Sequence, residues 1–322
     1  MTKKSEPLSK FLLPIDGEGT FKAACRLAGA LASILGERVS EITLLHVMAG
    51  RYLSTHMTNI DIRAGFVLES ETFQRLREQF INEKVTPIMN EAKKIVEQFH
   101  PKASVDMEIV DGKPAEKILE FVNKFGYSTV IMQRRCMDPV KGTFIGSVTS
   151  GILYGRGACS VYIPGTGFPE EGPVNFRHIL VPIDGSKGSM AAVREAGTFA
   201  NYSKDVEISL LNVMDVADIA AVAESGTGDW DGSLEEAQEV LKNGRQILVD
   251  MGVDPSKIAE KVLTGEPPEI IASYADETDI DIIFLGRTIR SALSDILVGS
   301  VARAVLGNCA KRTIAVVSPE EE

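Results

Sequence analysis

The sequence Ile282-Ile283-Phe284-Leu285-Gly286-Arg287 is an apolar run that ends at a glycine, and Gly299-Ser300-Val301 follows it at a distance of thirteen residues. Val305 and Leu306 then continue the apolar positions at helical spacing. This order predicts a buried strand, a loop over residues 288–298 and a helix that begins at the Gly-Ser pair. The free backbone N–H groups and the positive dipole end of such a helix favour an anion.

The same succession of patterns occurs twice in the chain. Gly299-Ser300-Val301 repeats Gly146-Ser147-Val148 after 153 residues, and Leu180-Val181-Pro182-Ile183-Asp184-Gly185 repeats Leu12-Leu13-Pro14-Ile15-Asp16-Gly17 after 168. Several collinear matches of this kind indicate an internal duplication. Because the offset drops along the chain, the first copy carries extra residues, which we place in the stretch 51–99.

Strand-like apolar runs alternate with helical patterns in both copies, which predicts an α/β fold with parallel sheets and helices on both faces. We expect a first domain over residues 1–164 and a second over 175–322. The segment 165–174 between them is rich in glycine, proline and acidic residues, as linkers are.

Composition excludes several classes of protein. The 322 residues favour about two domains. A formal net charge of −11 argues against binding to nucleic acid or to an anionic membrane. The four cysteines form no C-x-x-C pair and the four histidines have no metal-binding spacing, which fits a reducing compartment and no metal site. Without a secretory signal or a transmembrane segment, we expect a cytoplasmic protein.

The stretch Val181-Pro182-Ile183-Asp184-Gly185-Ser186, together with Gly286 and the later Gly299-Ser300, resembles the two-part fingerprint of the universal stress protein family. The resemblance covers nearly the whole chain as two tandem domains. It implies two doubly wound five-stranded parallel sheets, each with strand order 3-2-1-4-5. It also implies that the last strands, Val161-Tyr162-Ile163 and Ile314-Ala315-Val316, pair with each other and form an intramolecular pseudo-dimer, as exposed apolar edge strands require.

Members of this family that bind ATP hold it over the carboxyl ends of the strands. The resemblance therefore implies an ATP site, with magnesium accompanying the nucleotide, in the second domain. Asp184 and the backbone near Ile183 and Val213 would meet adenine and ribose, and the glycine-rich positions would face the phosphates. The residues expected at this site are Pro182, Ile183, Asp184, Val213, Gly286, Arg287, Gly299, Ser300 and Val301.

Both domains depart from the family motif. Its second glycine is replaced by Ile289, and a β-branched residue in a left-handed conformation costs roughly 1–2 kcal/mol. In the first domain both early glycines are replaced, by Gln133 and Cys136. We therefore expect that the first domain does not bind ATP in the family manner and that the second domain has an altered site.

Each candidate residue also has a purely structural interpretation. Asp16 and Asp184 are placed to cap a helix or to stabilise a turn, and the Gly-Ser pairs are ordinary helix starts. Arg287 and Arg290 fit solvated loop charges as well as phosphate ligands. Cys136 follows two arginines, whose charge could make it a reactive thiol. Because the sequence shows no neighbouring base, the alternative is an unreactive free thiol.

These observations favour a stress-response protein in which an adenine nucleotide on the second domain switches contacts with a regulatory protein partner or a homodimer. The alternative is a scaffold or dimerisation module without nucleotide. A slow adenine-nucleotide hydrolase is a further alternative, but the sequence has no P-loop, no nucleophile elbow and no convincing carboxylate pair. We therefore expect no catalytic residues and at most a weak ATPase.

Overall fold

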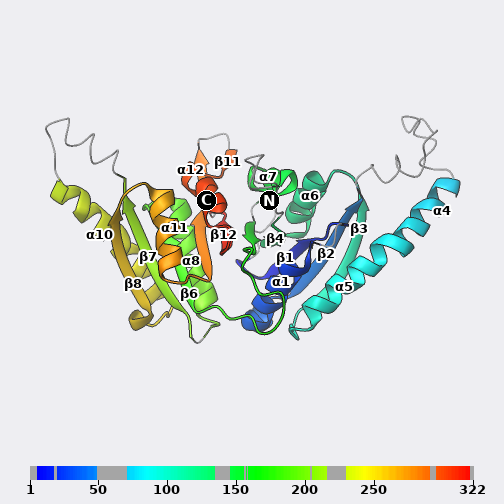
Figure 1. Ribbon diagram of the computed structural model, residues 1–322, viewed down its shortest axis with the longest axis horizontal. Helices are drawn as coiled ribbons and strands as arrows, with labels where there is room; N and C mark the ends of the chain where they lie inside the picture. The colour runs from blue at the N-terminus through cyan, green and yellow to red at the C-terminus, as the bar shows by residue number, and fades with distance from the viewer. Residues whose placement is uncertain are drawn as a thin grey trace.

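The computed structural model describes residues 6–17, 20–48, 71–134, 146–155, 157, 159–203, 205–215, 230–290 and 295–319. In this part of the chain one ten-stranded sheet runs through both halves of the molecule (Figure 1). Its strand order is β3-β2-β1-β4-β5-β12-β9-β6-β7-β8. Each half therefore contains five strands in the order expected from the resemblance, and the two halves meet at their last strands.

The first half contains five strands and the helices between them. The strands are β1 (Lys10–Pro14), β2 (Glu41–Met48), β3 (Ser104–Asp111), β4 (Thr129–Ile131) and β5 (Ser160–Ile163). The helices are α1 (Lys22–Leu35), α4 (Glu71–Phe80), α5 (Thr86–Glu97), α6 (Pro114–Phe125) and α7 (Ser147–Leu153), with a 3₁₀ turn over Gly36–Arg38 and a π-helical turn over Ile81–Val85.

The second half repeats this arrangement. Its strands are β6 (His178–Pro182), β7 (Glu207–Met214), β8 (Ile258–Thr264), β9 (Ile282–Gly286) and β12 (Thr313–Val317). Its helices are α8 (Lys187–Ala200), α10 (Trp230–Asp250), α11 (Pro267–Glu277) and α12 (Ser300–Asn308), with a 3₁₀ turn over Pro255–Lys257. A small antiparallel hairpin, β10 (Thr288–Arg290) and β11 (Asp295–Leu297), separates β9 from α12.

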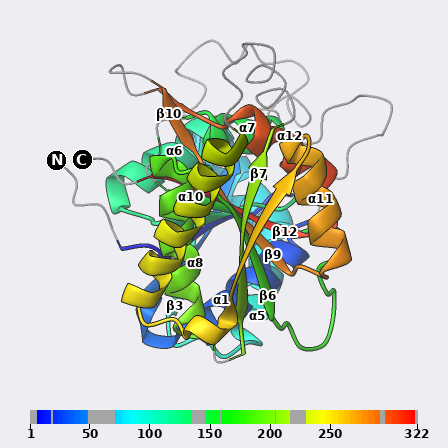
Figure 2. The same ribbon diagram turned by 90° about the vertical axis from the view of Figure 1, so that its left-hand side faces the viewer.

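Helices cover both faces of the sheet, so the apolar strands are buried on two sides. In the second half α8 and α10 lie on one face and α11 and α12 on the other (Figure 2). Each face has one apolar core, and each core continues from the first half into the second. The two domains are therefore packed as one body about the sheet.

The junction between the halves is an antiparallel pairing of β5 with β12. Ile163, Tyr162 and Val161 lie opposite Ile314, Ala315 and Val316, respectively. These are the two segments whose pairing was predicted, and the prediction is confirmed. All other neighbouring strands of the large sheet are parallel in the part of the chain described here.

A buried carboxylate forms hydrogen bonds across this junction. Glu195 of α8 is only 3% exposed, and it accepts hydrogen bonds of 2.6 Å from the hydroxyl groups of Tyr162 and Ser160 in β5. Burial and the neighbouring carboxylate raise the pKa of Tyr162, so the phenol stays a donor. The contact joins a helix of the second domain to the last strand of the first.

The segment 165–174, which composition marks as a linker, is packed onto the domains. Thr166 N donates to Ala310 O at 2.8 Å. The guanidinium of Arg26 in α1 donates to the carbonyl oxygens of Pro169 and Gly172 at 2.8 and 2.6 Å. Phe168 is 9% exposed and packs on Phe176. These contacts fix the connection rather than leaving it a free tether.

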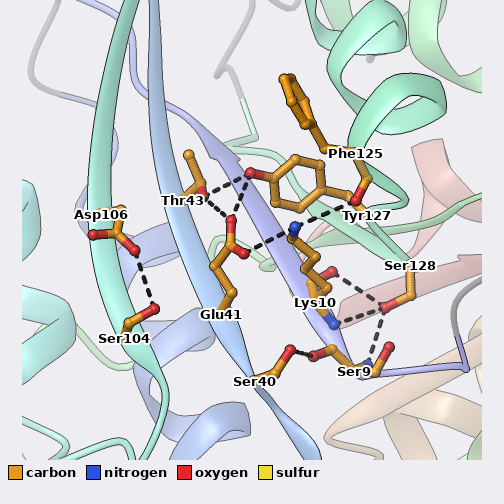
Figure 3. A network of polar contacts seen from close by, with 10 residues as sticks. All are labelled: Ser9, Lys10, Ser40, Glu41, Thr43, Ser104, Asp106, Phe125, Tyr127 and Ser128. Atoms are coloured by element: carbon orange, nitrogen blue, oxygen red, sulfur yellow. Dashed lines mark hydrogen bonds and ion pairs between the residues drawn. The ribbon is translucent and has the colours of Figure 1, made fainter.

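A network of polar side chains joins the amino ends of the first-domain strands, at the opposite end of the sheet from the strand carboxyl ends (Figure 3). Ser128 Oγ accepts from Lys10 N at 3.1 Å, and the Tyr127 hydroxyl donates to Glu41 at 2.9 Å. In the second domain the carboxylate of Asp281, 153 residues after Ser128, likewise accepts two backbone N–H bonds at the start of β6. In both copies polar side chains therefore form hydrogen bonds with the backbone at the amino ends of the strands.

We expect Tyr162→Phe to lower the free energy of unfolding by about 2 kcal/mol, because the buried carboxylate of Glu195 would lose the hydrogen bond that the Tyr162 hydroxyl donates. Tyr154→Phe is the matched control, since Tyr154 is 39% exposed and its change should stay within about 0.5 kcal/mol. Urea unfolding followed by circular dichroism measures both. Equal stability of the two variants would show that the Tyr162–Glu195 bond does not hold the junction.

Candidate functional site

A cavity of about 470 Å³ lies at the carboxyl ends of β6, β7 and β9 in the second domain. The turn after β6 and the N-termini of α11 and α12 complete its walls. Such a position, outside the ends of parallel strands, is where doubly wound sheets bind ligands. The lining residues are Pro182, Ile183, Asp184, Ser186, Ser189, Leu211, Val213, Pro267, Ile271, Leu285, Gly286, Val298, Gly299, Ser300, Val301, Ala302 and Arg303.

Asp184 is fixed by the turn between β6 and α8. Its Oδ1 accepts from Ser186 N at 3.0 Å and from the Ser189 hydroxyl at 2.7 Å. Burial alone would raise the pKa of the carboxyl group, but hydrogen bonds from Ser186 and Ser189 outweigh it and lower the pKa below its usual value. Asp184 therefore stabilises the turn, as its structural interpretation held, and presents an ionised carboxylate to the cavity.

The N-terminus of α12 faces the same cavity. Gly299 is the N-cap and has no side chain to bond the first N–H groups, and the first turn contains no acidic residue. Gly299, Ser300 and Val301 all line the cavity. The first N–H groups of a helix have no partner within it, and together with the positive end of the helix dipole they make this wall favourable for an anion.

Arg287 does not line the cavity, and the expectation that it faces phosphates is wrong. Its side chain is 0% exposed and extends into the first domain. The guanidinium donates to the carbonyl oxygens of Ile152 and Gly157 at 3.2 Å, and also to those of Leu153 and Cys159. These acceptors lie at and just after the C-terminus of α7, where helical carbonyl groups have no partner within the helix. Burial lowers the pKa of Arg287.

Gly286 has a packing role beside its place in the cavity wall. A Cβ atom at Gly286 would lie 2.2 Å from the backbone carbon of Gly188, at the start of α8. The reverse holds too, because a Cβ at Gly188 would lie 2.1 Å from Arg287 O. The end of β9 and the start of α8 thus approach so closely that both positions require glycine, with or without a ligand.

Ile289, which replaces the second motif glycine, lies in β10 with Ile296 of β11 as its Cα partner. Residues 288–290 and 295–297 therefore form a hairpin where the sequence predicts a loop. Among the non-glycine residues that the structure describes, positive φ occurs at Leu8, His100 and Asp279, so Ile289 is not in the left-handed region. The strain expected for a β-branched residue here does not arise, because the backbone has become extended.

The model of the universal stress protein family matches residues 7–162 and again residues 175–317. The chain belongs to the universal stress protein family. Universal stress protein MJ0531 of Methanocaldococcus jannaschii is 32% identical over 149 residues, which cover 46% of this chain and 85% of that protein. MJ0577 of the same organism is 26% identical over 159 residues, covering 44% of this chain and 96% of that protein.

Solved structures show the same tandem fold. The crystal structure of a universal stress protein from Archaeoglobus fulgidus DSM 4304 matches with a TM-score of 0.62 and 20% identity, over 98% of both chains. A universal stress protein structure from Pseudomonas aeruginosa UCBPP-PA14 matches with a TM-score of 0.54 and 17% identity, over 96% of this chain and 93% of that one. At these identities the likeness concerns the fold.

The first universal stress protein domain differs from the second at the end of β4. Gln133 occupies the position of Gly286, and its side-chain oxygen accepts from Ala24 N in the first turn of α1 at 3.1 Å. In the second domain the corresponding helix α8 is capped by Ser186, which accepts from Ser189 N. A glutamine side chain thus takes over the capping of the helix. Cys136 lies outside the described residues.

A second cavity, of about 400 Å³, lies in the first domain. Its walls come from the turn after β1, the end of β2 and the helical stretch 80–88, and they are Gly17, His46, Val47, Met48, Phe80, Lys84, Val85 and Ile88. His46 Nδ1 lies 2.8 Å from Ile15 O, and burial lowers its pKa. Asn212 makes the matching bond to Ile183 O in the second domain, so both residues have a strand-end role.

Sequence reasoning missed several residues of the second-domain cavity. Ser186 and Pro267 stand in motifs that the repeat had marked, so a closer look at their position beside the strand ends could have found them. Ser189, Ile271 and Arg303 carry no such signal, because only the packing of α8, α11 and α12 brings them to the cavity.

No helix that the structure describes is long and apolar enough to cross a bilayer. The described residues also contain no cluster of three or more metal-binding side chains.

We expect Arg287→Ala to lower the free energy of unfolding by about 3 kcal/mol, because several carbonyl groups at the end of α7 would lose a buried, charged donor. Arg177→Ala is the matched control, since Arg177 is exposed at the amino ends of the strands. Guanidinium unfolding gives the two values. A loss below about 0.5 kcal/mol for Arg287→Ala would contradict the interdomain role.

We also expect Gly286→Ala to destabilise the protein by about 1–3 kcal/mol, since the new methyl group would overlap the backbone of Gly188. Gly17→Ala serves as the control, because a Cβ at Gly17 meets nothing within 4 Å and the backbone there is not left-handed. Thermal unfolding gives the melting temperatures of both variants and of the wild type. If Gly286→Ala has the same melting temperature as the wild type, the close approach of β9 and α8 does not require glycine at position 286.

Proposed function

We propose that the second domain binds an adenine nucleotide, ATP above all, and that its occupancy regulates contacts with a protein partner. One observation carries the proposal: a single cavity is lined by the residues that the family fingerprint marks, apart from Arg287. These residues are Pro182, Ile183, Asp184, Val213, Gly286, Gly299, Ser300 and Val301. They come from four separate parts of the chain, and the sheet brings them together.

The size and chemistry of the cavity support a nucleotide. A volume of about 470 Å³ lies within the range of small-molecule sites. Apolar walls such as Leu211 and Ile271 suit a purine base, and the ionised Asp184 suits the hydroxyl groups of a ribose. The uncapped N-terminus of α12 suits phosphate. Among the described residues of the lining Asp184 is the one carboxylate, and we propose that magnesium enters with the triphosphate rather than occupying a site of its own.

The regulatory part of the proposal rests on the connection between the cavity and the first domain. Gly286 lines the cavity, and its neighbour Arg287 holds the end of α7. A ligand that shifts the end of β9 would therefore act directly on the domain junction. We propose residues 1–164 and 175–322 as the two functional units, the first serving the regulation of the second without a nucleotide of its own.

The second candidate is a scaffold that binds no nucleotide. It is favoured by the packing role of Gly286 and by the burial of Arg287, because both residues have structural reasons that need no ligand. In that reading the cavity is what remains of an ancestral site, and the tandem domains present surfaces to partners.

Isothermal titration of the nucleotide-free protein with Mg·ATP tests the proposal. We expect one equivalent to bind, and we expect Asp184→Ala to weaken binding at least tenfold, which corresponds to about 1.4 kcal/mol for the loss of a charged hydrogen-bond acceptor. Asp16→Ala, at the matching position of the first domain, should bind as the wild type does. Circular dichroism of the three proteins checks their folding.

A flat titration of well-folded wild-type protein up to millimolar ATP would contradict nucleotide binding and favour the scaffold. Equal weakening by Asp184→Ala and Asp16→Ala would contradict the assignment to the second domain.

A further inference from the structure

Among the described residues of the second-domain cavity wall, Arg303 is the one with a basic side chain, and it also contacts the first domain. It lies on α12, one turn after Gly299, and its backbone N–H bonds Gly299 O. The centre of its guanidinium lies 5.8 Å from the ring centroid of Tyr154. Tyr154 is the C-cap residue of α7 in the first domain. This pair therefore joins a side chain of the cavity wall to a side chain of the first domain.

The two domains are not symmetric at this contact. Arg287 and Arg134, which are 153 residues apart, form reciprocal bonds: Arg287 donates to Leu153 O, and Arg134 donates to Leu306 O at 2.9 Å. The positions that correspond to Arg303 and Tyr154 hold Ser150 and Gly307 instead. The arginine–tyrosine pair thus exists on one side of the junction, and it is the side with the motif-lined cavity.

Two positive groups lie together in this part of the wall, the exposed guanidinium of Arg303 and the N-terminus of α12. A cation near the positive end of a helix is unfavourable, and the first turn of α12 has no acidic residue to offset it. Asp184, the carboxylate of the same cavity, is engaged by Ser186 and Ser189. An anion between the guanidinium and the N–H groups of α12 would satisfy both positive groups at once.

From this geometry we propose that Arg303 binds the phosphate end of the ligand and that Tyr154, from the first domain, holds the guanidinium in place. The site is then built from both domains and selects phosphorylated nucleotides over neutral nucleosides. This inference rests on the proposed nucleotide site and adds the group that reads the phosphate. It gives the first domain a direct part in recognition although its own motif is degraded.

Titrations of the full-length protein with ATP and with adenosine test the inference. Arg303→Gln should weaken ATP binding about 10–100-fold, the effect of losing a charge-assisted hydrogen bond, and leave adenosine binding unchanged. Tyr154→Ala should weaken ATP binding about 2–5-fold, and Tyr154→Phe should leave it unchanged because the aromatic ring remains. In the Arg303→Gln background, Tyr154→Ala should have no further effect.

Arg177→Gln removes an arginine at the amino ends of the strands and controls for the change in net charge. It should bind both ligands as the wild type does. Wild-type protein that binds neither ATP nor adenosine would overturn the nucleotide site itself. Wild-type binding of ATP that survives Arg303→Gln, or an equal loss of ATP and adenosine binding in that variant, would overturn the role of Arg303 and leave the site standing. Additive effects of Arg303→Gln and Tyr154→Ala would overturn the positioning role of Tyr154.

Discussion

The pairing of β5 with β12 is the constraint on which the rest of the structure depends. Each strand would otherwise be the exposed apolar edge of a five-stranded sheet, which favours association with any other edge. Pairing them inside one chain removes both edges and makes one continuous sheet. The junction is closed further by Arg287 and Arg134, which donate to carbonyl groups near the ends of α7 and α12. Arg287 is fully buried, and a buried charge is costly without hydrogen bonds, so its bonds to the first domain help to hold the two domains together.

The two copies of the duplicated unit differ in structure at the same position of the fold. At the end of the fourth strand, Gly286 allows the closest approach of strand and helix, and the turn before α8 caps its own helix through Ser186. In the first domain Gln133 fills this place with a side chain and caps α1 directly. A side chain therefore accepts a hydrogen bond from the first turn of this helix in both copies. What differs is the surface left at the strand ends.

Much of the architecture could be predicted from sequence because it depends on local patterns and on repetition. Apolar runs ending at Pro14 and Pro182 define the first strand of each copy, and the order of elements follows from their alternation. The hairpin around Ile289 could not be predicted, since a motif glycine in relatives implies a turn and the substitution gives no sign of a new strand pair. The packing of residues 165–174 was equally hidden, because a composition typical of linkers does not show that Arg26 bonds two of their carbonyl groups.

By itself the sequence determined the duplication, the α/β class and the segments that join the two halves, because hydrophobic periodicity and collinear repeats are properties of the chain alone. Only the tertiary structure decided the direction in which side chains point. Arg287 follows a motif glycine and was expected to meet phosphates, yet it extends from the end of β9 into the first domain, where carbonyl groups at and just after the end of α7 accept its hydrogen bonds. Arg303 belongs to no motif, yet the packing of α12 brings it to the cavity. Spacing in the sequence shows which residues are close along the chain. Which side chain contacts a cavity or a carbonyl group depends on the packing of elements that are far apart in the sequence.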